Sequence, residues 1–227
     1  MSKASVDRSL KSLNMKWLVM LAGLDVVAVL LFVAPELVGN ASWGTVAVMR
    51  GLVALVLPVA VLLLTGMLDH DIKAKLVYWK LKDPYPGCEA FTRHGPADVR
   101  VDMVALKKNV GVLPTEPAEQ NRKWFKLYLL VENEVAVLEV HKSYLMYRDM
   151  AAMSIPLSVL VPAAMFFTGA AQAAVWGSTI LFAVQFFVCC VAARHSGKRF
   201  VCTVLAIHST KKVVAAPRAS VKTPKAQ

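Results

Sequence analysis

Charged residues are scarce in this sequence, and long parts of it contain none. Asp, Glu, Lys and Arg together make up 18% of the 227 residues, whereas hydrophobic residues make up 57% and the mean hydropathy is +0.53. This shortage excludes an ordinary soluble domain, because such a domain needs polar side chains to cover its core.

The sequence also lacks the motifs of common enzyme chemistry. It contains no GxxxxGK[ST] phosphate loop, no HExxH metal pair, no GxSxG elbow and no CxxC pair. The nearest metal pattern is Cys88 with His94, and two ligand types at this spacing are better explained by exposure or local packing. We therefore expect a protein that is not an enzyme and that holds no metal and no cofactor.

Long apolar runs fill much of the chain. A helix of about 20 apolar residues is long enough to cross a bilayer. The first run is too long for a signal peptide and is followed at once by another, so we expect it to be retained. Four runs meet this length, at residues 15–38, 45–68, 150–170 and 173–193.

The positions of the charges predict an orientation. The turns at 39–45 and 169–174 contain no charged residue, whereas residues 194–227 contain eight basic residues and no acidic one. Basic residues remain on the cytoplasmic side, so both termini and the segment between the hairpins should be cytoplasmic in a bacterial inner membrane. The four cysteines lie outside both turns, and no structural disulfide is expected.

The predicted fold is an all-α membrane protein with two transmembrane hairpins, a mainly helical cytosolic insert, a short C-terminal strand and a basic tail. Residues 69–82 should continue the second membrane helix until 83-DPYPGC-88 stops it, and 134–150 should run helically into the third span. The β-branched run 200-FVCTVLAI-207 indicates the strand. The predicted segments are a cytosolic N-terminal segment at 1–16, a first hairpin at 17–68, the insert at 69–149, a second hairpin at 150–193, a juxtamembrane segment with the strand at 194–210 and a disordered tail at 211–227.

Four polar residues fall inside the predicted spans: Asp25, Glu36, Arg50 and Gln185. Such residues need partners within the bundle. Glu36 and Arg50 are about equally far from the first turn, which favours an ion pair near the outer interface. Asp25 and Gln185 lie at similar depth from the inner side, at ~1.5 Å per residue, and should face each other. The alternative is that Asp25 lines an ion or proton path.

The C-terminal basic residues should lie close to the membrane surface. Anionic lipid headgroups attract Lys and Arg next to a membrane exit, at ~1 kcal/mol per residue. The residues expected to bind these headgroups are Lys198, Arg199, Lys211 and Lys212.

The insert resembles a known group of proteins. The segments that carry the resemblance are 78-YWKLKDPYPGCEAF-91, 98-DVRVD-102, 113-LPTEPAEQNRKWFKLY-128 and 141-HKSYLMYRDMAA-152. They resemble small bacterial inner-membrane proteins of phage-defence loci, in which membrane-spanning effectors accompany retrons and related sensing modules. The resemblance implies a toxin-like effector of antiviral defence. A cytosolic regulatory protein or ribonucleoprotein would keep it inactive, and without this regulator it would permeabilise or depolarise the membrane. A second copy of the chain, in a homo-oligomer, is a further expected partner.

The polar and aromatic residues of these segments are the predicted docking or regulatory surface. The alternative is that the polar residues form salt bridges on helix faces and that the tryptophans pack in the core of the insert. They are Trp79, Glu119, Asn121, Arg122, Trp124, Arg148 and Asp149. Two other functions stay open at this point: a small transporter or channel, and a membrane anchor that recruits a soluble partner.

Overall fold

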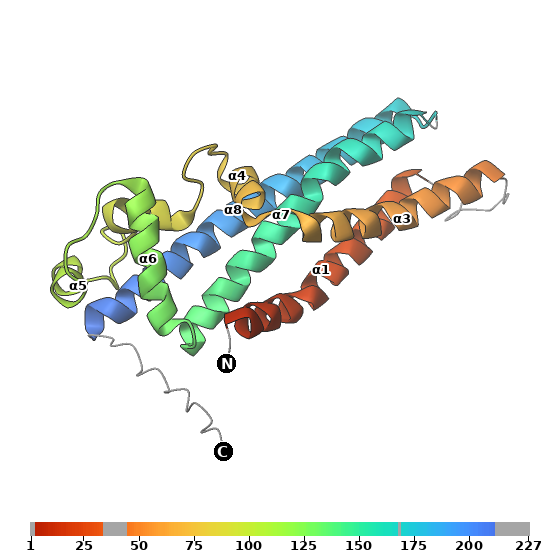
Figure 1. The fold of residues 1–227 in the computed structure, drawn as a ribbon. Helices are drawn as coiled ribbons and strands as arrows, with labels where there is room; N and C mark the ends of the chain where they lie inside the picture. Colours follow the sequence, from red (N-terminus) through yellow and green to blue (C-terminus); the bar gives the residue numbers. More distant parts are fainter. Residues whose placement is uncertain (1–2, 34–44, 168, 212–227) are drawn as a thin grey trace, which may run out of the picture.

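The chain folds into long helices with short connections (Figure 1). The fold is described here from a computed structural model, which covers residues 3–33, 45–167 and 169–211. Within these ranges no strand is formed. The all-α fold class is therefore confirmed for the described part of the chain.

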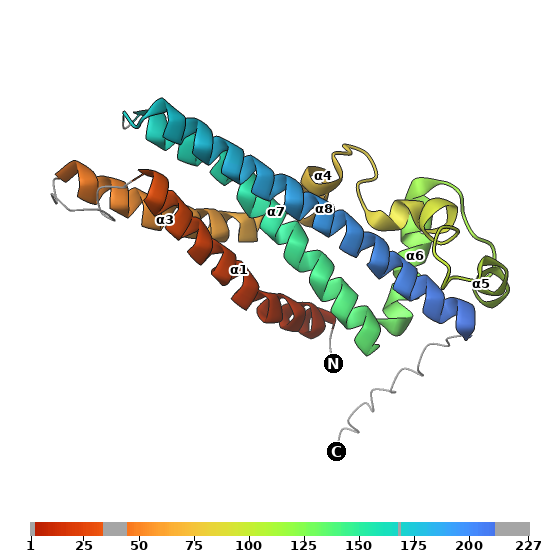
Figure 2. The same cartoon turned by 180° about the vertical axis from the view of Figure 1, so that it is seen from behind.

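Two antiparallel helix pairs build the frame. Helix α7 (Val135–Phe167) and helix α8 (Gln172–Thr210) lie side by side along most of their length. Helix α1 (Lys3–Val33) and helix α3 (Thr45–Met67) lie beside each other and against α7, as both views show (Figures 1 and 2). The Asn14 side-chain amide on α1 donates a hydrogen bond of 2.8 Å to the carbonyl oxygen of Lys142 on α7.

The outer faces of these helices form an apolar belt. Three helices, α1, α7 and α8, are long and apolar enough to cross a membrane, and the number is four if α3 and the helix after it form one broken span. These lengths and this exposed apolar surface are typical of a membrane protein. On α1, α3 and α8 the belt includes Val19, Met20, Leu24, Val27, Leu31, Leu55, Val56, Val59, Leu63, Leu64, Trp176, Ile180, Leu181, Val184, Phe187, Val188 and Val191.

The second predicted span does not continue straight, contrary to the expectation for residues 69–82. Helix α3 ends at Met67, and α4 (His70–Tyr78) leaves it at an angle of 110°. Asp69 has extended backbone angles at the start of α4. The bend lets α4 bury Lys73, Ala74 and Val77 against α7 and α8, which a straight continuation would leave exposed.

The insert forms a small helical core around the N-terminal part of α7 and the C-terminal part of α8. The helix ends before the predicted stop at 83-DPYPGC-88: α4 ends at Tyr78, where Trp79 adopts a left-handed conformation, and η1 (Pro86–Glu89) and η2 (Ala90–His94) follow. Asp102 accepts hydrogen bonds from two backbone amides at the start of α5 (Met103–Val110), and α6 (Pro117–Val131) completes the insert. The first part of α7 joins this core and continues without a break into the apolar belt.

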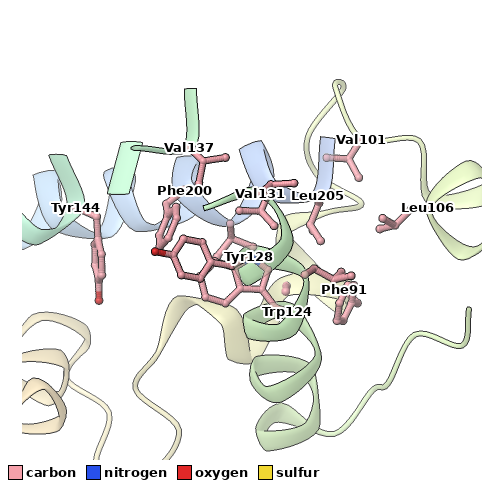
Figure 3. Packing of buried hydrophobic residues seen from close by; sticks show 14 residues of the cluster. Phe91, Val101, Leu106, Trp124, Tyr128, Val131, Val137, Tyr144, Phe200 and Leu205 are labelled. Atoms are coloured by element: carbon pink, nitrogen blue, oxygen red, sulfur yellow. The ribbon is translucent and has the colours of Figure 1, made fainter. Parts of the chain in front are cut away.

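Aromatic rings fill the centre of that core (Figure 3). The ring of Phe200 on α8 lies 5.0 Å from Trp124 and 5.3 Å from Tyr128, both on α6, and 4.5 Å from His141 on α7. The C-terminal part of α8 is thus the element on which the insert is assembled.

The predicted C-terminal strand is wrong. Residues 200–207 are part of α8, which runs unbroken to Thr210. Phe200, Val201, Cys202, Val204 and Leu205 are buried around the whole circumference of the helix, because other elements of the insert surround it. Burial on all sides hides the helical period, and this packing overrides the β-preference of the residues. The predicted tail lies outside the described residues, apart from its first residue, Lys211.

Candidate functional site

Buried charges gather where α4 crosses α7. Oδ1 of Asp149 lies 3.2 Å from Nζ of Lys73 and accepts hydrogen bonds from Nε and Nη2 of Arg148 at 3.1 and 2.9 Å. The three side chains are between 4 and 11% exposed. Nη1 of Arg148 lies 2.9 Å from Nδ1 of His70. We call these four residues the junction cluster.

The junction cluster fixes the position of α4. Lys73 and His70 belong to α4, whereas Arg148 and Asp149 belong to α7, so every contact between these two pairs links the helices. Burying these charges costs desolvation free energy, and the attraction between the oppositely charged side chains offsets that cost. If the ions separated while they stayed buried, this attraction would be lost and the desolvation cost would remain. The Tyr85 hydroxyl donates to Oδ1 of Asp71 at 3.3 Å, which connects the segment after α4 to this helix.

Arg194 lies at the C-terminal end of the apolar belt on α8. Its Nε donates a hydrogen bond of 2.7 Å to the carbonyl oxygen of Val77. Its guanidinium lies 4.0 Å from the centre of the Trp79 ring, which in turn stacks at 6.1 Å on Phe187. Trp79, one of the predicted regulatory residues, is 56% exposed and follows directly after α4. It therefore lies between the belt and the insert.

A polar contact joins three helices inside the belt. Gln185 on α8 donates from Nε2 to Oδ1 of Asp25 on α1 at 3.0 Å and to Oγ of Ser154 on α7 at 3.1 Å. The predicted pairing of Asp25 with Gln185 is confirmed. Oδ2 of Asp25 is buried and has no hydrogen-bond partner among the described residues. The other predicted pair is not described, since Glu36 and the side chain of Arg50 lie outside the described residues.

The predicted docking residues fall into two groups. Glu119 and Arg122 are exposed on α6, whereas Trp124 is buried in the insert core. Asn121 is partly buried, and its side-chain oxygen lies beside Gly87, where an added Cβ would be only 2.4 Å away. Arg148 and Asp149 are buried in the junction cluster. Glu119, Arg122 and Trp79 are thus the members of this set whose side chains are exposed, and Asn121 is partly exposed.

The predicted lipid-binding residues that the structure describes lie in the C-terminal part of α8 and directly after it. Lys198 and Arg199 are exposed on α8. Nζ of Lys211 lies 3.3 Å from Oε1 of Glu134, and Lys212 lies outside the described residues. In the described ranges, no group of three or more His, Cys, Asp or Glu side chains is arranged to hold a metal ion.

Sequence reasoning missed several residues of these sites. Lys73 and His70 were not among the predicted site residues, because residues 69–82 were expected to continue the second membrane helix. Gln120 was also missed: its Oε1 accepts from the backbone amides of Phe91 and Thr92, and its Nε2 donates to the carbonyl oxygen of Thr115. A polar residue on the apolar face of 117–131 was the available signal.

Comparison of the chain with protein-family models, with curated proteins and with solved structures found no match. The resemblance to phage-defence effectors therefore stays a prediction from the sequence segments given above.

Proposed function

We propose that this chain is a four-span effector of the bacterial inner membrane, with both termini and the insert in the cytoplasm. In this proposal the protein is not an enzyme, and its insert controls whether the membrane-spanning helices leave the membrane tight or make it permeable. The uncharged turns and the apolar belt support the four spans, and the basic C-terminal segment supports the orientation.

The junction cluster is the observation that carries this proposal. It ties α4, which follows the second span directly, to α7, which is shared by the insert and the belt. A partner that moves α6 would act on α7 and α8, because Trp124 and Tyr128 pack against Phe200 and His141. The same movement would strain the ion pairs that hold α4. A movement of the insert would thus be transmitted to the second and third spans, because the ring contacts of α6 and the ion pairs between α4 and α7 would have to break together.

The exposed residues of α6 are the proposed docking surface for the cytosolic regulator. Glu119 and Arg122 face solvent on this helix, on the side opposite the buried Trp124. The phage-defence role and the identity of the regulator, a protein or a ribonucleoprotein, rest on the sequence resemblance and are proposed on that basis alone.

A membrane-potential dye tests the effector role. Expression of the chain in bacteria without its regulator should depolarise the cells and stop growth, and Asp149→Asn should change the strength of this effect because it loosens α4. Glu139→Gln is the matched control, since Glu139 is exposed on the same helix. Cells that keep their potential at verified expression would contradict the proposal and favour an anchor. Solute-specific flux without toxicity would favour a transporter.

The transporter or channel is the second candidate, and one observation favours it. The buried Oδ2 of Asp25 has no hydrogen-bond partner among the described residues, and a buried carboxylate inside a span is typical of ion and proton paths. Asp25→Asn should then abolish flux while the protein still accumulates in the membrane.

Reporter fusions test the orientation separately. Fusions after residue 100 and after residue 211 should both report the cytoplasm. Export of either site to the periplasm would overturn the proposed topology and, with it, the cytosolic docking surface.

A further inference from the structure

A basic pocket lies between the segment 78–97 and α8. Its volume is about 400 Å³, within the usual range for small-molecule sites. Four of its lining residues are basic, namely Lys80, Arg93, Arg194 and Lys198. Two are acidic, Asp83 and Glu89, which leaves a net charge of +2 with the two lining histidines neutral (four minus two).

Hydrogen bonds order one side of this pocket. Glu89 accepts from Lys80 and, at 2.9 Å, from Arg93. Burial raises the pKa of Glu89, but the hydrogen bonds from these two residues outweigh it and hold the pKa below its usual value. Glu89 therefore stays ionised near neutral pH and positions both cations at the pocket wall.

On the α8 side of the pocket, Arg194 has a hydrogen-bond donor without a partner among the described residues. Arg194 uses Nε for the Val77 carbonyl oxygen, but its buried Nη2 has no hydrogen-bond partner among the described residues. A buried guanidinium nitrogen without a partner is costly unless a ligand or water accepts its hydrogen bond. Lys198, one turn further along α8, is exposed and lines the same pocket.

The location of the pocket indicates the source of its ligand. On the described part of α8, the exposed large apolar side chains end at Val191. Arg194 follows three residues later, ~4.5 Å along the helix axis. The exposed ring of Trp79 lies beside it, as expected for a tryptophan at a membrane interface. The pocket thus lies at the level where lipid phosphates would meet α8.

We propose that this pocket binds a phosphate group, carried by an anionic phospholipid headgroup whose acyl chains lie along Phe187, Val188 and Val191, or by a soluble phosphate compound. Lys198 would donate to the phosphate oxygens, and Arg194, Lys80 and Arg93 would add attraction from the pocket walls. Basic pockets beside membrane helices on the cytoplasmic side bind anionic headgroups in this way. This inference requires only that α8 crosses the membrane, and it stands apart from the effector role.

Binding can be measured with the full chain in neutral detergent. The unfolding midpoint is followed while short-chain phosphatidylglycerol, short-chain phosphatidylcholine, sodium phosphate or sodium chloride is added. We expect phosphatidylglycerol to raise the midpoint most, and phosphatidylcholine and chloride to have little effect. A shift with sodium phosphate as large as that with phosphatidylglycerol would support the pocket and identify a soluble phosphate compound as its ligand.

Variants assign this binding to the pocket. Lys198→Gln and Arg93→Gln should each weaken the apparent affinity about fivefold, the factor that corresponds to ~1 kcal/mol per basic residue. Lys108→Gln, an exposed position on α5 that does not line the pocket, should leave it unchanged. The proposal is overturned if phosphatidylcholine stabilises the protein as much as phosphatidylglycerol, or if both pocket variants bind like the unchanged chain.

Discussion

Nε2 of Gln185 lies 3.0 Å from Oδ1 of Asp25, and this hydrogen bond joins two residues that are 160 positions apart in the sequence. It connects α8 of one helix pair to α1 of the other, and Ser154 of α7 shares the same amide at 3.1 Å. Together with the hydrogen bond from Asn14 on α1 to Lys142 on α7, this contact links both helix pairs. Its loss should therefore loosen their association rather than unfold either pair.

Replacing Gln185 by Leu should destabilise the bundle. The variant removes an interhelical hydrogen bond, which contributes ~1 kcal/mol inside membranes, and it leaves the buried Asp25 without this donor, which adds ~1–3 kcal/mol. Thermal unfolding in detergent, followed by circular dichroism, measures the loss.

The matched control is Val184→Leu, because Val184 is an exposed neighbour on α8. A double variant that also carries Asp25→Leu should lose less stability than the sum of the two single variants, since the unpaired carboxylate is gone. Additive losses would show that the two side chains do not interact.

The junction cluster makes a second prediction. In Asp149→Asn the side chain keeps its shape but loses the charge that faces both Lys73 and Arg148. Removing one partner of a buried ion pair costs roughly 3–5 kcal/mol, because the remaining charges stay buried. Chemical unfolding in detergent should detect this loss. Glu139→Gln should be close to neutral, and a loss of the same size there would mean that the effect is not specific to the cluster.

Several features were predictable because they follow from counting along helices. The depth of Asp25 and Gln185 follows from their distances to Lys16 and Arg194, and the structure pairs them. The cap at Asp102 depends on a residue whose preference for the start of a helix is strong. Local chemistry and helix geometry were sufficient in these cases.

Other features depend on tertiary contacts that no local pattern encodes. The bend between Met67 and His70 is favourable because α4 finds a surface on α7 and α8 to cover. The stretch 200-FVCTVLAI-207 has strand-forming residues, and it is helical because the insert buries every side of it. The junction cluster was not predictable for the same reason, because the bend between α3 and α4 is what brings Lys73 next to Asp149.

A third prediction concerns the close approach of α4 to α8 at Gly197. A Cβ added to this glycine would lie 2.1 Å from the Tyr78 hydroxyl oxygen and 3.2 Å from the Tyr144 ring. Gly197→Ala should therefore push α4 away from α8 and cost about 1–3 kcal/mol, as overpacking does in other cores. The unfolding midpoint in detergent measures this cost.

Gly23→Ala is the control for Gly197→Ala. A Cβ at Gly23 would meet nothing within 4 Å, and alanine favours the helix over glycine. We expect this variant to be neutral or slightly more stable. Equal losses in both variants would mean that Tyr78 and Tyr144 move aside without cost at Gly197.

The last prediction concerns pH and His94 in the insert. Burial lowers the pKa of His94, and the nearby Glu89, at 4.0 Å, opposes this shift only in part. The unfolded chain, with an ordinary histidine pKa, then binds more protons than the folded chain as pH falls below about 6.5. Stability should decrease over that range, at no more than about 1.4 kcal/mol per pH unit for one proton, and level off below the lowered pKa.

His94→Gln isolates the contribution of this residue, because glutamine does not titrate and the other ionisable groups are unchanged. The unfolding free energy of the unchanged chain minus that of the variant should be constant above about pH 7. It should become smaller below about pH 6.5, because only the unchanged chain loses stability through His94. Parallel pH profiles would mean that His94 gains its proton equally well in the folded and unfolded chains. In that case burial and the neighbouring cations Arg93, Lys198 and Lys80 would not disfavour the imidazolium, contrary to the lowered pKa.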